Sequence, residues 1–485
     1  MDKNQIRLLI SRFFICIWLI QWVPFIPVGG ALSSGLAREV RKAPKARKDM
    51  WELTPEERQI LAHANARIEK YRTGTANLSF FSTRGKPVAN VAVKIEQTQH
   101  EFQFGANHSI HIWKAIAQRK YGMRSEPNKK FKISGDQIKK YTEKFIQFAN
   151  YTSLPVRWII YEPRKDEIKY DVYEREIQYL HKNGFKVLAH MLVWNNNTPP
   201  WVPADCNKLA KAVEKRVRDF VSYYKGKIDY FLVFNEPARP FRRLFAKDKM
   251  TNCIRRFGKE SFVSMPFKVA RTADPTAKLM INEIAIREQH GFPDLLRSLR
   301  DSKGKNLYDI IGIQSHMHKG IWPLDGVWEV CEGYSTFGVP IHFTEVTVLS
   351  GTPMSGKRYG MVTTPEGERR QAEYVVNLYT TLFSHPAVEA IQWWNLTDLG
   401  AWKGAPAGLL RDDMSPKPAY YALMDLIKRK WWTKTQTKTS KQGECTFKGF
   451  FGNYKITVTP LSGEARTVMM SLTKDGERSF RFILE

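Results

Sequence analysis

Cysteine is scarce in this chain of 485 residues, and its five cysteines show none of the short spacings that bind zinc. Cys16 lies in an apolar N-terminal stretch, and Cys206, Cys253, Cys331 and Cys445 are far apart. A structural zinc site is not expected, and we predict neither a metal nor an organic cofactor. One or two disulfides can form if the chain is exported, but four cysteines allow three pairings, and free buried thiols fit equally well.

Acidic residues are the minority: 48 aspartates and glutamates stand against 76 lysines and arginines, which gives a formal net charge of +28. A charge of this size attracts polyanions at low salt. The basic residues are dispersed, however, and the sequence contains no nucleic-acid-binding motif. Nucleic acid is therefore not expected to be a partner.

Long hydrophobic runs are missing except near the N-terminus. Three basic residues, Lys3, Arg7 and Arg12, precede an apolar stretch from Phe13 to Val28, and small residues follow it. This order predicts a secretory signal peptide over residues 1–31. The alternative is an uncleaved membrane anchor, because the stretch approaches spanning length, although one glutamine and two prolines interrupt it. We expect a secreted, periplasmic or cell-envelope protein, with membrane contact only if this N-terminus is uncleaved.

Small β elements are predicted on both sides of a large central region. A basic linker covers residues 32–50, and residues 51–100 read as one helix from Thr54 to Tyr71, with a capping-box start, followed by an alternating stretch over 77–98. That stretch predicts a β-hairpin or a few strands. Residues 431–485 alternate again and predict a second β module. Because neither module can bury a good core alone, we hypothesise that the two pack together as one sandwich.

Residues 101–430 repeat a pattern of strand, loop and helix. Strands are predicted near 102–107, 151–158, 185–193, 228–235, 278–284, 309–316, 340–346 and 388–396, with amphipathic stretches at 137–149, 172–184, 207–224, 259–272 and 367–384. Eight such units favour a closed (β/α)8 TIM barrel of the α/β class over an open sheet. Active sites of such barrels lie at the carboxyl ends of the strands.

Two glutamates follow buried strand-like runs in this region. Glu236 ends the fourth predicted strand and Glu345 the seventh. A retaining glycosidase needs one carboxylate as nucleophile and a second as acid and base, about 5 Å apart. Taken singly, each glutamate is more simply an ordinary solvated loop acid. Two of them at strand ends across one barrel mouth favour glycosidase chemistry.

Several segments agree in order and spacing with one known family. They are His190-Met-Leu-Val-Trp194, Thr198-Pro-Pro-Trp201, Phe234-Asn-Glu-Pro237, Gly312-Ile-Gln-Ser-His316, Phe343-Thr-Glu345, Trp394-Asn-Leu-Thr-Asp398 with Ala401-Trp402, and Pro416-Lys-Pro-Ala-Tyr420. On these motifs the chain resembles family 10 of the glycoside hydrolases, the endo-β-1,4-xylanases, as a divergent member over residues 101 to 425.

The resemblance implies a retaining mechanism with Glu345 as nucleophile and Glu236 as acid and base. It also implies that Asn235 binds the 2-hydroxyl of the reacting sugar and that His316 holds the nucleophile ionised. Further substrate contacts are expected from a larger set: His190, Trp194, Gln314, and the tryptophans Trp394 and Trp402, which would wall the reacting sugar. Each of these histidines and tryptophans, taken alone, fits a structural role equally well.

Five positions depart from the family pattern. Where the family reads Glu-Asn-x-x-Lys-Trp on strand two, this chain has Ser153-Leu-Pro-Val-Arg157-Trp, so two polar sugar contacts are lost while Arg157 keeps the positive charge. Asn195 replaces a histidine, and Thr347 replaces an aspartate two residues after the nucleophile. We still expect Arg157 and Asn195 to contact substrate.

The expected partner is a plant-type β-glycan, xylan above all, bound by a monomer. Glucuronate-decorated xylan is a sharper hypothesis, because the segment after Glu236 is rich in basic residues that pair with uronates: Arg239, Arg242, Arg243, Lys247, Lys249, Arg255, Arg256 and Lys259. The plain alternative is a solvated charged face. Five Asn-x-Ser/Thr sequons, several of them at predicted strand ends where a glycan would block the cleft, favour a bacterial source. Two rival functions remain: cleavage of another β-linked or acidic glycan, and carbohydrate binding without turnover.

Overall fold

The computed structural model describes residues 52–108, 133–168, 170–241, 245–284, 291–351, 362–459 and 464–484. The chain divides into two units, Met1–Arg38 and Glu39–Glu485, and the first lies wholly outside the described residues. The predictions for residues 1–31 and 32–50 therefore fall outside the described residues, as do Arg242 and Arg243 of the basic loop.

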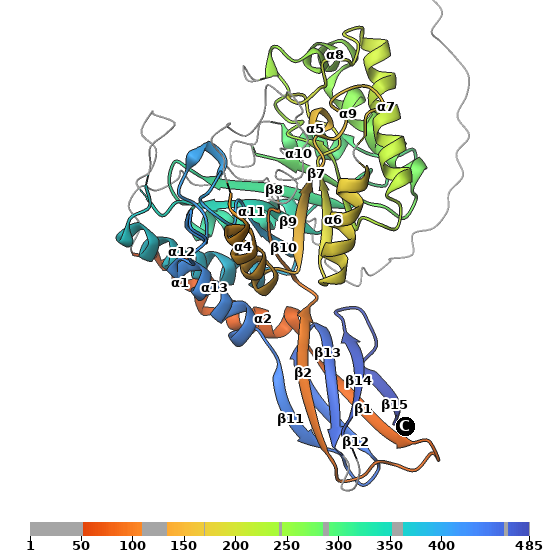
Figure 1. Cartoon of the computed structure of the whole chain (residues 1–485), viewed down its shortest axis with the longest axis vertical. Coiled ribbons are helices and arrows are strands. Elements are labelled where there is room, and N and C mark those ends of the chain that lie inside the picture. The colour runs from red at the N-terminus through yellow and green to blue at the C-terminus, as the bar shows by residue number, and fades with distance from the viewer. Residues whose placement is uncertain are drawn as a thin grey trace, which may run out of the picture. The chain divides into compact units, whose positions relative to one another are not determined.

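Eight parallel strands close into a barrel (Figure 1). In order they are β3 (Gln103–Ala106), β4 (Tyr151–Pro155), β5 (Lys186–His190), β6 (Tyr230–Asn235), β7 (Lys278–Glu283), β8 (Ile310–Met317), β9 (Ile341–Val348) and β10 (Val388–Trp393). Closure is made by β10, which pairs with both β9 and β3. The predicted (β/α)8 fold is confirmed, and each predicted barrel strand overlaps an observed one.

Helices surround the barrel and pack their apolar stripes onto it. They are α4 (Gly135–Phe148), α5 (Trp158–Tyr161), α6 (Tyr170–Lys182), α7 (Cys206–Tyr223), α8 (Lys249–Phe257), α9 (Lys259–Ala273), α10 (Phe292–Ser298), α11 (Leu324–Ser335), α12 (Pro365–Ser384) and α13 (Pro418–Asp425), with short turns η2 (Trp402–Gly404) and η3 (Leu426–Lys430). In α7, Asp205 caps the first turn, and Leu209, Val213 and Phe220 recur on one buried face.

The barrel strands are buried on both faces, which explains their apolar runs. Inside the barrel, a layer of side chains from alternate positions fills the axis, so the interior is a packed core and not a pore. This inner layer consists of Tyr151, Leu188, Met191, Leu232, Met280, Ile310 and Ala390.

The segment before the first strand differs from the prediction of one helix. It forms α1 (Pro55–Ala62) and α2 (Ala64–Arg72), separated at His63, where φ is −90° and ψ is −2°. The capping box is present, with Thr54 and Glu57 exchanging hydrogen bonds. The residues around His63 have good helix propensity, so the sequence carries no signal of the break.

Strands from both ends of the Glu39–Glu485 unit share two sheets. One sheet has the order β12 (Glu444–Phe450), β1 (Thr73–Ser82), β15 (Ser479–Leu484), and the other β11 (Lys434–Lys438), β2 (Ala92–His100), β13 (Gly452–Thr459), β14 (Arg466–Leu472). The two sheets enclose one apolar cluster that includes Leu78, Val93, Phe447 and Ile456. Of the two predicted alternatives, a hairpin or a few strands, the stretch forms strands: β1 and β2 lie in different sheets. The chain also turns back at the predicted Arg-Gly-Lys-Pro turn, where Phe81 and Pro87 form an antiparallel bridge and the Val88 N–H donates to the Phe80 carbonyl at 2.9 Å. Alternation reveals a strand but not its partner.

One disulfide joins Cys206 at the start of α7 to Cys253 in α8. Cys331 and Cys445 are free and buried. The disulfide links the helix that follows the third barrel strand to the helix that follows the loop after Glu236.

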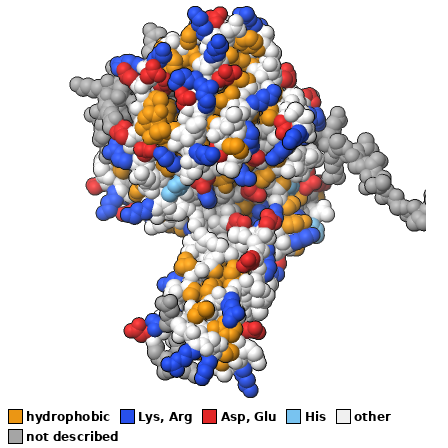
Figure 2. Space-filling view, turned by 90° about the vertical axis from the view of Figure 1, so that its right-hand side faces the viewer, with side chains coloured by type: hydrophobic (Ala, Val, Ile, Leu, Met, Phe, Trp, Pro, Cys, Tyr) orange, Lys and Arg blue, Asp and Glu red, His pale blue; other side chains and the backbone are white. Residues whose placement is uncertain are grey.

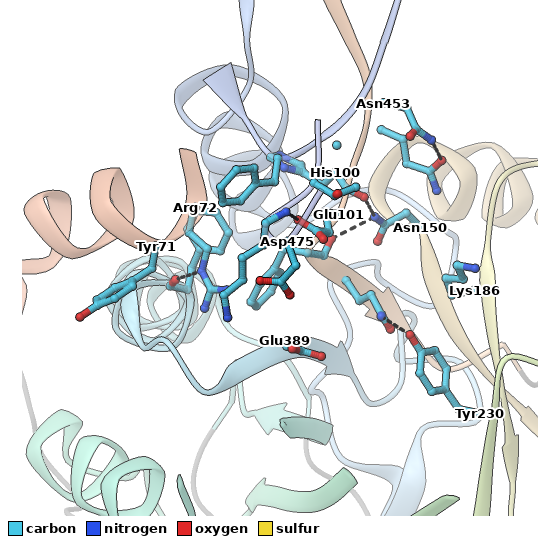
Figure 3. Close-up of a pocket in the computed structure, with 18 residues that line it drawn as sticks. Tyr71, Arg72, His100, Glu101, Asn150, Lys186, Tyr230, Glu389, Asn453 and Asp475 are labelled. Atoms are coloured by element: carbon cyan, nitrogen blue, oxygen red, sulfur yellow. Dashed lines mark hydrogen bonds between the residues drawn. The ribbon is translucent and has the colours of Figure 1, made fainter. Parts of the chain in front are cut away.

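A pocket of about 360 Å³ lies where β2 leaves the sandwich and β3 enters the barrel (Figure 3). Charged side chains line it from both parts, among them Arg72, Glu101, Glu389, Lys474 and Asp475. The Arg72 guanidinium is buried and donates to three backbone carbonyls of the barrel at 2.7, 2.5 and 2.7 Å. Burial raises the pKa of the Glu101 and Glu389 carboxyls. The junction between sandwich and barrel is thus polar, with its charges partly balanced.

The molecular surface shows no single basic patch on the face in Figure 2, where Lys and Arg side chains are spread among acidic and uncharged ones. Among the residues that the structure describes, no helix has the length and apolar character needed to cross a membrane.

Candidate active site

Glu236 lies directly after β6, at the carboxyl end of the barrel. Its φ is 55°, a left-handed conformation that is unfavourable for a residue with a Cβ and that clusters at functional sites. The backbone N–H of Glu236 donates to the Asn282 carbonyl at 2.8 Å, and the Gln314 amide donates to Glu236 Oε1 at 3.3 Å. These contacts hold a buried carboxylate at the barrel mouth.

Glu345 on β9 is buried and surrounded by donors. His190 Nε2 lies 3.1 Å from Oε1, Asn282 Nδ2 donates to the same oxygen at 3.0 Å, and His316 Nε2 lies 2.9 Å from Oε2. Burial by itself would raise the pKa of the Glu345 carboxyl, but the hydrogen bonds and charges of the two histidines outweigh it and hold the pKa well below its usual range. The group is an ionised carboxylate at neutral pH.

Thr347 orients His316 from the other side of the ring. Its hydroxyl donates to the Trp394 carbonyl at 2.8 Å, and His316 Nδ1 lies 2.8 Å from the same hydroxyl oxygen. Because the hydroxyl has one hydrogen, it accepts from Nδ1, while Nε2 faces a carboxylate that can only accept. Thr347 thus serves as an uncharged partner of His316 where the family pattern has an aspartate.

An amide network connects the two carboxylates. Asn282 Nδ2 and Gln314 Nε2 both donate to Asn235 Oδ1, at 2.9 and 3.3 Å, and Thr344 donates to Asn282 Oδ1 at 2.7 Å. With its oxygen occupied, Asn235 has its Nδ2 group left, and no described residue accepts from it. This geometry suits donation to a substrate hydroxyl.

Trp394 and Trp402 lie beside the histidines of the site. The Trp394 ring is 5.1 Å from the His190 ring and is largely buried. Trp402, in η2, is 4.4 Å from His316 and 4.9 Å from His318, and 40% of it is exposed. Trp402 thus has an open surface available for contact with the CH groups of a sugar.

Arg157 and Trp194 form a pair of unused donors near the carboxylates. The Arg157 guanidinium lies 5.7 Å from the centre of the Trp194 ring. Burial lowers the pKa of Arg157, and the charges of Glu345 and Glu236 oppose this effect. Neither Arg157 Nε nor Trp194 Nε1 has a hydrogen-bond partner among the described residues. Both therefore fit the expected role in substrate binding.

Asn195 differs from the expectation. It is fully buried, and its amide donates to the Pro240 carbonyl at 2.8 Å and to the Thr251 hydroxyl at 3.1 Å. Its amide N–H groups thus support the loop after Glu236, while its Oδ1 is buried with no hydrogen-bond partner among the described residues. A polar residue after a strand is compatible with either role, and only the packing distinguishes them. Ser153 and Leu154 are fully buried as well.

The loop after Glu236 uses some of its basic residues internally. Lys249 Nζ donates to the Pro200 carbonyl at 3.0 Å and also to the Val202 carbonyl, and Lys259 lies 3.6 Å from Glu260. Arg255 lies over the Phe241 ring at 5.0 Å, and Phe241 is 49% exposed. The described part of this loop therefore presents an aromatic and cationic surface on the catalytic face, although not every predicted cation is free for a ligand.

The comparisons with known proteins agree with this geometry. The model of glycosyl hydrolase family 10 matches residues 120–426. The chain belongs to glycosyl hydrolase family 10. Among the residues that the structure describes in this family 10 barrel, no three His, Cys, Asp or Glu side chains are grouped to hold a metal ion.

Relatives of this family 10 chain include proteins of two kinds. Anti-sigma-I factor RsgI6 of Acetivibrio thermocellus is 28% identical over 406 residues, which are 83% of this chain and 47% of that protein. Endo-1,4-beta-xylanase B of Thermotoga neapolitana is 27% identical over 289 residues, 57% of this chain and 79% of that enzyme. The chain thus spans less than half the length of RsgI6.

Solved structures share the fold. Xylanase 10B from Thermotoga petrophila RKU-1, in complex with xylobiose, superposes with a TM-score of 0.53 at 22% identity, covering 68% of this chain and 95% of that one. At this identity the likeness shows the barrel fold alone.

Sequence reasoning missed several residues of the family 10 site. Asn282 bridges Glu345 and Asn235, and the fully buried Glu283 accepts from the backbone N–H of Ala238 at 2.8 Å, just after Glu236. A signal was present: the fifth barrel strand ends in Asn-Glu, as the fourth does. His318, buried beside Trp402, has a pKa lowered to about 3 by burial and by nearby positive charge, and no such signal marks it.

Proposed function

We propose that this protein is a retaining endo-1,4-β-xylanase. Glu345 attacks the anomeric carbon of the xylose before the scissile bond while Glu236 donates its proton to the departing oxygen. The resulting glycosyl ester on Glu345 is then hydrolysed by water, from which Glu236 removes a proton. The ester bond breaks, which regenerates the Glu345 carboxylate, and Glu236 is protonated again. Both groups therefore return to their starting states.

The observation that carries the proposal is the environment of Glu345. A nucleophile must be ionised although it is buried, and two histidines with one asparagine amide supply the donors that keep it so. Asn235, with its oxygen occupied by Asn282 and Gln314, would donate to the 2-hydroxyl, where hydrogen bonds strengthen in the oxocarbenium-like transition state.

Xylan as the substrate is supported by family membership and by relatives named xylanases. Reducing-sugar release should be measured on glucuronoxylan, arabinoxylan and mixed-linkage glucan. We expect release from a xylan, lost in Glu236→Ala and Glu345→Ala and retained in Glu260→Ala, whose side chain is exposed on α9. A fluorinated xylobioside should label Glu345 covalently. Absence of release and of labelling would refute the proposal.

A second candidate is a glycan-binding sensor without turnover. It is favoured by the match to a protein named an anti-sigma factor, which extends over 83% of this chain. Such a sensor would bind xylo-oligosaccharides with measurable affinity, yet release no sugar and resist labelling by the fluorinated xylobioside. Calorimetry beside the activity assay separates the two candidates.

We also propose that residues 1–31 direct export and are removed, and that the mature protein acts as a monomer in the secreted or cell-envelope fraction. The basic N-terminal residues and the following apolar stretch support export. N-terminal sequencing of protein recovered outside the cytoplasm should begin after residue 31. Recovery of the intact N-terminus in membranes would favour an anchor instead.

A further inference from the structure

A pocket of about 250 Å³ lies between α7 and the segment from α5 to the start of α6. Six large aromatic or aliphatic side chains line it: Trp158, Tyr161, Ile168, Tyr170, Trp201 and Phe220. The two tryptophans are fixed, since Trp158 Nε1 donates to Glu162 Oε2 at 2.9 Å and Trp201 Nε1 to the Glu162 carbonyl at 3.0 Å. The volume is below that of a pocket for a drug-sized ligand and suits one sugar residue.

A buried cation that makes no ion pair with any described residue lines this pocket. Arg216 of α7 is 5% exposed, and its Nη2 donates to the Val156 carbonyl at 2.8 Å. Its Nε is buried without a hydrogen-bond partner, and among the described residues no carboxylate lies within ion-pair distance of the guanidinium. Tyr161 and Phe220 lie against its face at 4.3 and 4.6 Å. A buried guanidinium with unused donors is suited to a carboxylate brought by a ligand.

The acidic groups of the pocket are largely committed to other partners. Glu162 accepts from Trp158 and from the Asp166 backbone N–H at 2.9 Å. Asp219 is paired with Lys215 at 2.6 Å. At the rim, the exposed Lys208 has no ion pair among the described residues and adds positive charge, while Asp166 opposes it. The donors to Glu162 are neutral, so its negative charge remains. The lining nevertheless carries four cations, Lys165, Lys208, Lys215 and Arg216, against three carboxylates, Glu162, Asp166 and Asp219, so its net charge is positive.

Two loops connect the lining of the pocket to residues of the candidate active site along the chain. Trp158, the first residue of α5, lines the pocket and directly follows Arg157 in the sequence. Trp201, which also lines the pocket, lies on the loop that begins at Trp194. Arg157 is close enough to Glu345 and Glu236 for their charges to act on it, and its guanidinium lies 5.7 Å from the centre of the Trp194 ring. A side branch of a polysaccharide lying in the cleft could thus reach the pocket over one of these loops.

We propose that this pocket binds a uronic acid branch of the polysaccharide, with the sugar ring against Trp201 and Tyr170 and its carboxylate on Arg216. The inference rests on the proposed function, because it places a xylan main chain in the cleft. The enzyme would then prefer a xylan with glucuronate branches to a xylan with neutral substituents.

The test compares xylotetraose with xylotetraose that carries one 4-O-methylglucuronate branch. The ratio of kcat/KM for the branched to the unbranched substrate is measured for the full chain and for Arg216→Gln, Lys208→Gln and Lys211→Gln. Lys211 is exposed on α7 and does not line the pocket, so its variant is the matched control. Thermal unfolding of each variant reports on folding.

We expect the ratio to fall about tenfold in Arg216→Gln and about twofold to threefold in Lys208→Gln, with kcat/KM on unbranched xylotetraose unchanged. Lys211→Gln should match the parent. An unchanged ratio in folded Arg216→Gln would overturn the proposal, and if that variant does not fold, an unchanged ratio in Lys208→Gln would overturn it.

A binding measurement distinguishes failure of the pocket proposal from failure of the proposed function. If the parent chain cleaves neither oligosaccharide, binding of both is measured by calorimetry. Tighter binding of the branched compound that is weakened in Lys208→Gln but not in Lys211→Gln supports the pocket even without turnover. Equal binding of the two compounds by the parent chain refutes it.

Discussion

Replacing His316 with alanine tests how the nucleophile is kept ionised. Glu345 is buried, and burial alone raises the pKa of its carboxyl, while His190 and His316 lower it further than burial raises it. In His316→Ala the burial remains and one of the two histidine donors, at 2.9 Å, is lost. The pKa of Glu345 must therefore rise.

The size of the effect follows from the bond removed. A hydrogen bond to a charged group contributes about 1.5 to 3 kcal/mol, and 1.36 kcal/mol corresponds to one pH unit, so the pKa should rise by about one to two pH units. The attacking group must be ionised, so activity is lost as pH falls through this pKa. The acidic limb of the profile therefore moves to higher pH in the variant. In the parent, ionised Glu345 stabilises the fold at pH values above the unfolded-state pKa of about 4.3, and this stability is lost as pH falls through the lower folded-state pKa. In His316→Ala the folded-state pKa is higher, so the stability should be lost at a higher pH.

The assay is kcat/KM on xylotetraose as a function of pH, which reports groups of the free enzyme. His318→Ala is the control, because His318 is also buried two residues further on and makes no hydrogen bond to Glu345. An acidic limb that stays in place in His316→Ala, with the protein folded, would show that this histidine does not set the ionisation of Glu345.

Three further changes have defined outcomes. Arg157→Met removes a cation beside both carboxylates and should lower kcat/KM on xylotetraose about tenfold, mainly through KM; unchanged kinetics would contradict its role in binding. Reducing the disulfide between Cys206 and Cys253, which are 47 residues apart, should destabilise the barrel by about 4 kcal/mol in the chain-entropy model, seen as a lower Tm with reductant. Deleting residues 435–485 removes both strands that pair with β1 and should lower Tm by about 5 °C or more; an unchanged Tm would show that the deleted strands do not stabilise the rest of the protein.

The barrel could be predicted because its strands are buried on both faces and read as short apolar runs between amphipathic helices. Pairing over long separations could not be predicted. Leu78 pairs with Cys445 and with Phe480, and period-two alternation in either segment is compatible with any partner strand.

The carboxylates of the site could be predicted for a similar reason: an acid directly after a buried parallel strand must lie at the barrel mouth. The direction in which a polar side chain points could not be predicted from the sequence. Asn195 follows the same strand as His190, yet one supports a loop while the other contacts the nucleophile. Sequence spacing places both near the mouth, and side-chain packing decides between them.

The interleaving of the two sheets imposes an order on folding during synthesis. β1 and β2 leave the ribosome before the barrel, but β11, β12, β13 and β15, with which they pair, are made only after it. Until then, both strands expose unpaired backbone donors and acceptors, the kind of edge that promotes aggregation. A chain that stops after the barrel would therefore contain a complete catalytic face together with two strands, β1 and β2, whose partner strands are absent. We expect synthesis through β15 to be needed to cover these edges.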